Sequence, residues 1–370
     1  MKIILCVTND ISTDRRVMRI AETLSKLPAD IIVVGRKYNC MDISSCNFRI
    51  RRFRMIINKG PLFYAFYNLR LFLYLIVKKA DILVANDLDT LPAVYLAARV
   101  KRINVVYDCH EYFLEMPELV GRKWVRKIWS VFESVILPHL KYSYTVSQSI
   151  AAGYRQKYGI SMQVIRNFPL RLECVQRDAT LRIKPHEKTI VYQGSLNIGR
   201  GLELAIKTMQ FINDANLVII GTGDLETGLK QLVTDLSLNK CVVFTGRIKP
   251  DDLQKYTCNA DMGISLEEKL GLSYFYSLPN KLFDYIQARI PVLVSNLPEI
   301  SAVVKKYNIG IIAETDNPFE IAALMRKILF DEVKRKEWMT GLETASQELC
   351  WENEEVKLLN LYRSVSLKNR

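Results

Sequence analysis

Residues 190–206 read IVYQGSLNIGRGLELAI, and this stretch indicates the fold of the chain. IVYQG (190–194) predicts a short buried strand, and the apolar spacing after Gly201 predicts a helix. The glycines between them, Gly194, Gly199 and Gly201, suit a tight strand-to-helix turn. Strand, glycine-rich turn and helix are the units from which parallel α/β sheets are built.

The same alternation extends along the chain in two series. Strands are expected at 2–8, 31–35, 49–56, 82–85, 104–108 and 144–147, and then at 190–194, 217–221, 242–246, 262–266, 291–295 and 309–313. Helices are expected at 13–27 with Ser12 or Thr13 as the cap, and at 61–79, 90–102, 122–140, 148–158 and 332–364. Near-continuous apolar strands that alternate with helices are typical of parallel sheets buried on both faces. We therefore predict an α/β chain with two doubly wound, Rossmann-like domains.

A polar, proline-flanked segment separates the two series, at PLRLECVQRDATLRIKPHEK (169–188). We place a basic N-terminal domain at 1–170, a linker at 171–187 and a second domain at 188–345. A C-terminal helix at 346–370 could pack back on the first domain. Ligands of open parallel sheets bind beyond the carboxyl ends of the strands, so two such domains facing each other would form a cleft.

The cysteines, the apolar runs and the N-terminus indicate where in the cell the protein is expected to work. The 370 residues include eight scattered cysteines without a C-x-x-C pair, which favours reduced thiols in the cytosol over disulfides or zinc. The longest apolar run, Leu71–Val77, is far shorter than the roughly 18 residues of a membrane span. Because the N-terminus turns polar early, no secretory signal is expected, and the predicted localisation is cytoplasmic.

The net charge of +13 is concentrated in one half. Residues 1–170 contain 26 Lys and Arg against 13 Asp and Glu, so the whole excess lies there. Such an asymmetry predicts an anionic partner, which could be a membrane surface, a nucleic acid or a phosphorylated substrate. Alternatively, the excess charge in residues 1–170 forms a solvated surface that keeps the protein soluble and binds no partner.

The second half holds the most specific pattern, SLPNKLFDYIQARIPVLVS (277–295). Asn280 is expected to cap a helix beside Pro279, which places Lys281 in the first turn. A cation there opposes the helix dipole unless an anion binds. Asp284 lies one turn further along the same face, and lysine with carboxylate suits a phosphate and a ribose hydroxyl.

These segments, together with LVIIGTGDLE (217–226) and VVFTGRIKPDDLQKY (242–256), resemble the GT-B glycosyltransferases of the family 4 type. The resemblance covers nearly the whole chain. It implies GT-B architecture, two Rossmann-like domains facing a cleft, and a retaining transfer from a nucleoside-diphosphate sugar. It implies no metal or other cofactor, and UDP or GDP as the nucleotide of the donor.

The resemblance also assigns the donor site. Arg200 takes the position of one diphosphate-binding cation, whereas Ser195 stands where the family has another, and Lys281 could supply that charge. In the family's Glu-x7-Glu motif, Asp284 falls on the ribose-binding glutamate and Tyr276 on or near the sugar-binding one. Further donor-binding candidates are Gly194, Gly221, Gly223, Arg247, Ser277, Leu278, Pro279 and Asn280.

In the first half, His110 follows the strand ending at Asp108, and a neutral histidine there suits sugar hydroxyls and proton transfer. The resemblance places such a histidine against the donor sugar, so His110 joins Arg200 and Lys281 as a catalytic candidate. Asp14, Arg15 and Glu111 are the acceptor-binding candidates. Asp87 and Asp89 form a D-x-D, for which we favour wall or capping roles over metal binding.

The stretch PLFYAFYNLRLFLYLIVKK (61–79) is aromatic and flanked by basic residues. It predicts a helix that packs mainly in the core, with some apolar side chains facing an anionic membrane. The predicted function is transfer of a sugar to a saccharide acceptor of surface polysaccharide synthesis, free or lipid-linked.

Three alternatives remain open at this point. The first is an epimerase of the same architecture, against which the family motifs at 194–201 and 277–291 argue. An inactive partner subunit would explain Ser195 and Tyr276. A basic protein that binds nucleic acid or a membrane rests on the charge, but no nucleic-acid-binding motif is found and no nucleic-acid partner is expected.

Overall fold

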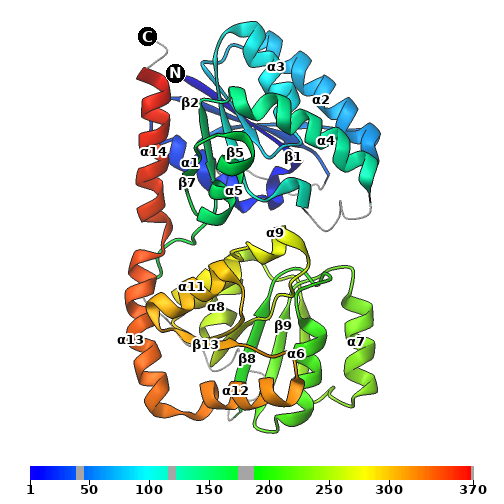
Figure 1. The fold of residues 1–370 in the computed structure, drawn as a ribbon, viewed down its shortest axis with the longest axis vertical. Coiled ribbons are helices and arrows are strands. Elements are labelled where there is room, and N and C mark those ends of the chain that lie inside the picture. The colour runs from blue at the N-terminus through cyan, green and yellow to red at the C-terminus, as the bar shows by residue number, and fades with distance from the viewer. Residues whose placement is uncertain (39–45, 116–121, 174–186, 368–370) are drawn as a thin grey trace. The chain divides into compact units, whose positions relative to one another are not determined.

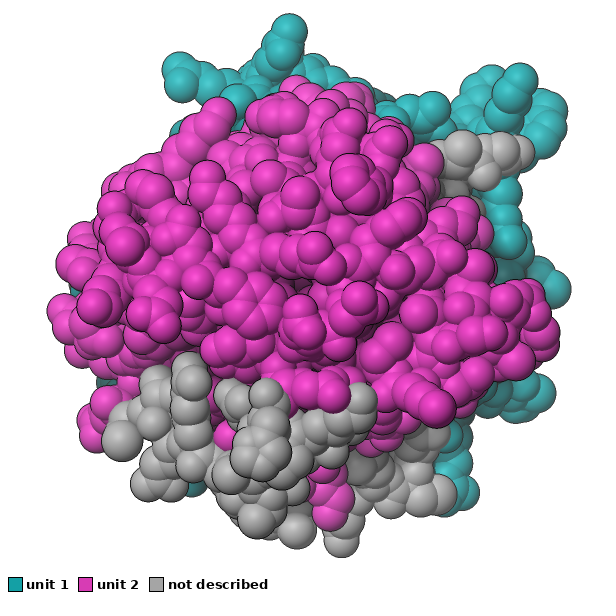
Figure 2. Space-filling model, turned by 90° about the horizontal axis from the view of Figure 1, so that it is seen from below, with its two compact units in different colours: residues 1–167, 354–370 teal, residues 168–353 magenta. Residues whose placement is uncertain are grey.

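The computed structural model describes residues 1–38, 46–115, 122–173 and 187–367. They form two compact units, 1–167 with 354–370, and 168–353 (Figures 1 and 2). Most of the predicted linker, 174–186, lies outside the described residues. Each unit is described by itself below.

The described part of unit 1 contains a seven-stranded parallel sheet in the order β3-β2-β1-β4-β5-β6-β7. The strands are β1 Lys2–Asp10, β2 Asp30–Arg36, β3 Arg49–Phe53, β4 Ile82–Asn86, β5 Asn104–Cys109, β6 Tyr142–Thr145 and β7 Gln163–Val164. The strand order reverses between β1 and β4, and this reversal marks the edge where a ligand is expected.

Helices cover both faces of this sheet (Figure 1). They are α1 Arg15–Leu24, α2 Gly60–Val77, α3 Leu91–Lys101, α4 Lys123–Ile136, α5 Gln148–Tyr158 and α14 Trp351–Leu367, with 3₁₀ turns at Ile11–Thr13, Phe113–Glu115 and Leu137–His139. α2 has a buried stripe, Phe63, Tyr67, Leu71 and Leu75, spaced four residues apart. Only 22% of the helix is buried, so the prediction that it packs mainly in the core is wrong.

The second unit repeats the pattern with a six-stranded parallel sheet among its described residues, in the order β10-β9-β8-β11-β12-β13. The strands are β8 Lys188–Gln193, β9 Ala215–Ile220, β10 Val242–Gly246, β11 Met262–Ser265, β12 Val292–Ser295 and β13 Gly310–Ala313. The helices are α6 Leu202–Thr208, α7 Glu226–Asp235, α8 Pro250–Cys258, α9 Gly271–Phe275, α10 Asn280–Gln287, α11 Pro298–Tyr307, α12 Pro318–Phe330 and α13 Glu332–Glu348, with a 3₁₀ turn at Met209–Phe211. The reversal lies between β8 and β11.

The structure confirms both predicted strand series and the α/β class, with three local corrections. The first helix begins at Arg15 and is capped by Asp14, whose carboxylate accepts from the backbone N–H of Val17 at 3.1 Å. Ser12 and Thr13 lie instead in the 3₁₀ turn before it. The C-terminal helix predicted at 332–364 is two helices, since the chain leaves helical geometry at Leu349.

The third correction concerns Asn280, which was expected to be a helix cap. The capping position of α10 is Pro279, without a side-chain hydrogen bond, and Asn280 is the first helical residue. A proline fixes its own φ and leaves the first-turn N–H groups of the helix without a side-chain acceptor at that position.

Residues 354–370 belong to unit 1, not to the unit that precedes them in the chain. Glu355 forms an ion pair with Lys26 at 2.6 Å, and Glu354 accepts from the backbone N–H of Arg166 at 3.0 Å. Apolar side chains of α14, including Leu358 and Tyr362, are fully buried.

Candidate functional site

Closely packed glycine turns follow the strands at the reversal point of unit 2. Gly194 and Gly221 have φ values of +141° and +144°, which few other residues adopt. A Cβ on Gly221 would lie 1.8 Å from the carbonyl oxygen of Gly194, and one on Gly201 would lie 1.9 Å from that of Leu266. A Cβ on Gly223 would meet the carbonyl oxygen of Leu196 at 2.5 Å. The turns therefore present backbone at the carboxyl edge of the sheet, as phosphate-binding loops do.

Lys281 lies in the first turn of α10 and is buried, with its Nζ 2.7 Å from Oε1 of Glu267. A lysine in the first turn of a helix was expected to need an anion, and in this structure the anion is the carboxylate of Glu267. The ammonium also lies 4.0 Å from the ring centre of Tyr192. Burial and the nearby Arg200 lower the pKa of Lys281, Glu267 raises it, and the net shift is downward.

Arg200 adds a second cation beside this pair. Its guanidinium lies over the ring of Tyr274 at 4.9 Å, and its buried Nε has no hydrogen-bond partner among the described residues. Arg200 is near enough to lower the pKa values of both Lys281 and Glu267. Two cations against one carboxylate leave an excess positive charge, which favours an anionic ligand such as a diphosphate.

Asp284 is held at the end of β8 by a hydrogen-bond chain. Nε2 of Gln193 donates to its carboxylate at 2.6 Å, and Thr257 Oγ1 donates to Oε1 of Gln193 at 2.6 Å. Asp284 remains partly exposed, so it can accept a further bond from a ribose hydroxyl.

The other donor candidates surround these residues at the same edge of unit 2. Tyr276 ends α9, and the three residues from Ser277 to Pro279 connect it to α10, all partly buried. Ser195 is exposed directly after β8, and Arg247 is exposed directly after β10. The structure therefore places every donor candidate within the strand-end loops of one sheet or at the start of α10.

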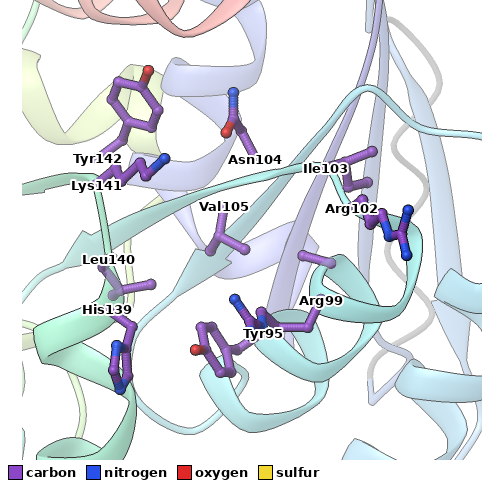
Figure 3. A pocket seen from close by; sticks show the side chains of 11 residues that line it. Tyr95, Arg99, Arg102, Ile103, Asn104, Val105, His139, Leu140, Lys141 and Tyr142 are labelled. Carbon is purple, nitrogen blue, oxygen red and sulfur yellow. The ribbon is translucent and has the colours of Figure 1, made fainter. Parts of the chain in front are cut away.

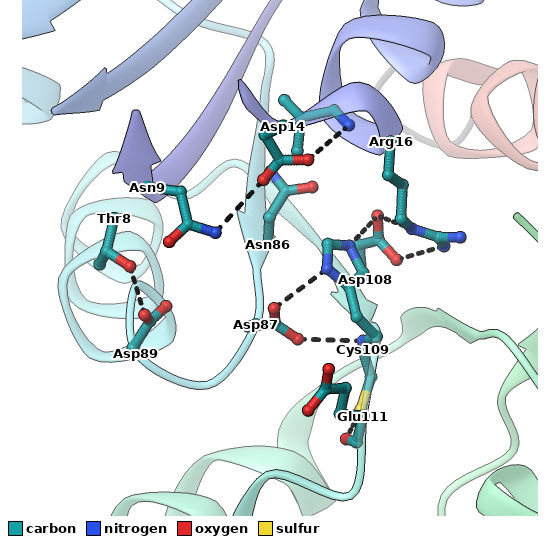
Figure 4. Close-up of polar contacts among 12 residues, drawn as sticks. Thr8, Asn9, Asp14, Arg16, Asn86, Asp87, Asp89, Asp108, Cys109 and Glu111 are labelled. Atoms are coloured by element: carbon teal, nitrogen blue, oxygen red, sulfur yellow. Dashed lines mark hydrogen bonds and ion pairs between the residues drawn. The ribbon is translucent and has the colours of Figure 1, made fainter. Parts of the chain in front are cut away.

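In unit 1, His110 lies between the carboxylates of Asp87 and Asp108, which are both labelled in Figure 4. Its Nδ1 lies 3.0 Å from Asp87, its Nε2 lies 3.0 Å from Asp108, and its backbone N–H donates to Asp87 at 3.0 Å. Burial lowers the pKa of His110, but Asp108 and Asp87 together raise it well above its ordinary value. The two carboxylates therefore favour the protonated form of His110, whereas the sequence analysis considered a neutral histidine.

Arg16, which was not among the predicted site residues, completes this network. Its guanidinium binds Asp108 at 2.7 Å, and both side chains are buried. Burial raises the pKa of Asp108, but Arg16 and His110 lower it by more, so the net pKa is about 2. The basic pair at 15–16 was visible in the sequence, but nothing there indicated that Arg16 points inward and Arg15 outward.

The D-x-D residues have separate partners. Asp87, at φ +63°, holds His110, whereas buried Asp89 accepts a hydrogen bond from the hydroxyl of Thr8. Burial and the nearby Asp87 raise the pKa of Asp89 to about 7. Among the described residues, no group of three or more His, Cys, Asp or Glu could hold a metal ion.

The acceptor candidates differ in role. Asp14 is occupied as the cap of α1, and Arg15 is exposed on the first turn of that helix. Glu111 is exposed and lines a cavity of about 800 Å³ together with Asp87 and Asp89.

A basic hollow lies at the opposite edge of this sheet (Figure 3). It has a volume of about 400 Å³, and its cationic lining comes from Arg99, Arg102 and Lys141, with His139 beside them. These side chains gather where α3 and the 3₁₀ turn Leu137–His139 end, and the helix dipole favours cations at such an end.

Comparisons with known proteins agree with this architecture. The family described as Glycosyltransferase Family 4 matches residues 13–168, and Glycosyl transferases group 1 matches residues 176–341. An uncharacterised glycosyltransferase of Methanocaldococcus jannaschii is 27% identical over 190 residues, which are 50% of this chain and 47% of that protein. The chain thus matches about half the length of that relative.

Two solved structures have the same fold. Sucrose-phosphate synthase of Thermosynechococcus elongatus superposes with a TM-score of 0.82 at 16% identity, with 100% of each chain covered. Anabaena HepE, solved in complex with UDP and also with UDP-glucose, has a TM-score of 0.75 at 14% identity, with 98% of this chain and 100% of HepE covered.

Proposed function

The chain is a GT-B protein of the group 1 glycosyltransferases, and on this basis we propose that it transfers a sugar from a nucleoside-diphosphate donor. The observation that carries the proposal is the cluster of Arg200, Lys281 and the glycine turns at the reversal point of unit 2. Excess positive charge beside bare backbone suits a diphosphate. The UDP complexes of HepE support a uridine donor, with GDP as the other candidate.

Within this proposal, Asp284 binds the ribose, and the loop at Gly246 and Arg247 contacts the base. Tyr276, Ser277, Leu278 and Asn280 border the donor, and Tyr276 stands where the family has a sugar-binding glutamate. The identity of the sugar follows from contacts in this region, so Tyr276 is the position that we expect to set donor preference.

We propose that the transfer retains the anomeric configuration, as the resemblance implies. The acceptor hydroxyl oxygen bonds to the anomeric carbon while the bond from that carbon to the diphosphate oxygen breaks. The hydroxyl proton passes to the released diphosphate. Arg200 and Lys281 stabilise the charge that develops on the leaving group.

His110 then acts mainly as a positioning residue. Because both ring nitrogens face carboxylates, its charge fixes Asp87, which lines the cavity of unit 1. Contact between His110 and a sugar hydroxyl, as first expected, would require the release of Asp87 or Asp108.

We propose further that unit 1 works at an anionic membrane surface, on the cytoplasmic side. α2 is the one described helix that is long and apolar enough to cross a membrane by length and composition, with 22% of that window buried. One stripe packs in the core, and the rest of the helix exposes Leu62, Phe66, Leu69, Leu73 and Val77. An exposed apolar face with basic neighbours suits a helix lying on lipid.

The experiment that tests the proposed function is donor turnover. The purified chain is incubated with radiolabelled UDP- and GDP-sugars and a bacterial lipid extract, and the label is followed into the lipid phase. Donor-dependent transfer that is lost in Arg200→Ala supports the proposal. Binding of the donor without transfer or hydrolysis would favour an inactive partner subunit.

A further inference from the structure

The cavity of about 800 Å³ in unit 1 has two chemically different ends. This volume is typical of small-molecule sites, which hold roughly 300–1,000 Å³. Its polar lining comes from the carboxyl ends of the strands: Thr8, Asn9, Asp87, Asp89 and Glu111. Its apolar lining comes mainly from α2 and α4: Pro61, Leu62, Ala65, Val125, Ile128, Trp129 and Phe132.

The apolar end is built on a fixed aromatic wall. The ring of Trp129 meets those of Tyr64 and Phe113 edge to face, with centroids 5.5 Å and 5.4 Å apart. Leu62 and Ile128, at the same end, are 61% and 54% exposed. Apolar side chains that stay exposed around a cavity favour an apolar occupant.

The occupant must match both ends. A free saccharide would leave the aliphatic side chains of Leu62 and Ile128 in water, and a simple fatty chain would bring hydrocarbon against carboxylates. Arg122 also lines the cavity, and Lys123 follows it at the start of α4, so cations lie near the apolar end. Carboxylates for hydroxyls, cations for a phosphate and an apolar wall for hydrocarbon together describe one amphipathic molecule.

We propose that this cavity binds an acceptor whose sugar is joined through a phosphate to a long hydrocarbon chain. The sugar hydroxyls lie toward Asp87 and Asp89, and the hydrocarbon lies between α2 and α4. This inference rests on the proposed glycosyl transfer and names its acceptor class.

The test uses farnesyl phosphate, kept monomeric, as the probe and calorimetry as the readout. Saturable binding at one site is expected in the wild type, and Ile128→Asp should weaken it at least tenfold by placing a charge in the apolar wall. The matched control is Val131→Asp, since Val131 is 53% exposed on the same helix but does not line the cavity. Its affinity should stay within twofold of the wild type.

A second control separates the cavity from the basic hollow. Arg102→Glu reverses a charge in that hollow, so it should leave farnesyl phosphate binding unchanged. Loss of binding in Arg102→Glu, or equal losses in Ile128→Asp and Val131→Asp, would overturn the proposal. Each variant is also titrated with UDP. A wild type that binds UDP but not farnesyl phosphate refutes the acceptor class alone, and one that binds neither refutes the proposed function as well.

Discussion

Lys281 Nζ lies 2.7 Å from Oε1 of Glu267, and the two side chains form an almost wholly buried ion pair at the start of α10. The pair satisfies each charge within unit 2, while Arg200 nearby has a buried Nε without a partner among the described residues. The net positive charge available to a ligand therefore depends on all three residues together.

Removing Lys281 and removing Glu267 should change ligand binding in opposite directions. Lys281→Ala leaves Glu267 as a buried, uncompensated anion, so we expect a stability loss of about 3–5 kcal/mol and no detectable UDP binding. Glu267→Gln leaves Lys281 without its counter-ion, so UDP affinity should rise or hold despite some loss of stability. Denaturant unfolding and calorimetry measure both quantities. Equal loss of UDP binding in the two variants would contradict a role for Lys281 toward phosphate.

The glycine turns allow a sharp test of local geometry. Gly221→Ala would place a methyl group 1.8 Å from a backbone oxygen at a φ of +144°, so we expect destabilisation of several kcal/mol or failure to fold. Gly228→Ala is the control, because Gly228 lies within α7 with no atom near its would-be Cβ. Replacing that helical glycine should raise stability by about 0.5–1 kcal/mol. A tolerated Gly221→Ala would show that the turn is not as close as the structure indicates.

Asp89 predicts a pH dependence of stability. Its pKa is raised to about 7 in the folded state, so the carboxyl is held protonated at pH values where the unfolded chain is ionised. Stability contributed by the neutral form is therefore complete below about pH 4 and is lost as the pH rises to about 7, by at most about 4 kcal/mol. Unfolding curves between pH 4 and 8 should show this slope in the wild type and lose it in Asp89→Asn. An unchanged slope in the variant would assign the titration elsewhere.

His110 predicts a pH dependence of the same sign, in a higher pH range. Its folded pKa is raised, so the stability from the imidazolium is fully present below its ordinary value near 6.5 and is lost as the pH rises through the folded value. His110→Gln should be less stable than the wild type at pH 6, and the gap should narrow at alkaline pH. A gap that stays constant from pH 6 to 9 would mean that the charge on His110 contributes nothing.

Strand periodicity was sufficient to predict both sheets, because buried parallel strands such as β1 and β9 are nearly continuous apolar runs. Periodicity could not predict β7, which has two residues and no apolar run. Helix starts were less predictable than helices, since Asp14 and Ser12 are both good caps and only packing decides between them.

Pairings across long sequence distances account for the site residues that were missed. Glu267 lies in a polar loop, and it can be recognised as a site residue only once the fold brings Lys281 of α10 to it. Arg16 meets Asp108 from 92 residues away. The raised pKa of His110 follows from Asp108 and Asp87, and no local sequence pattern indicates that contact.

The central claim is that unit 2 binds a nucleoside diphosphate, and the most direct measurement is thermal unfolding with UDP, GDP, ADP and CDP. A ligand present at about 100 times its dissociation constant adds about 2.7 kcal/mol, which for a domain of this size raises Tm by about 5 °C. We predict such a shift with UDP or GDP and its loss in Arg200→Ala. A folded protein whose Tm is unmoved by all four nucleotides would contradict the account.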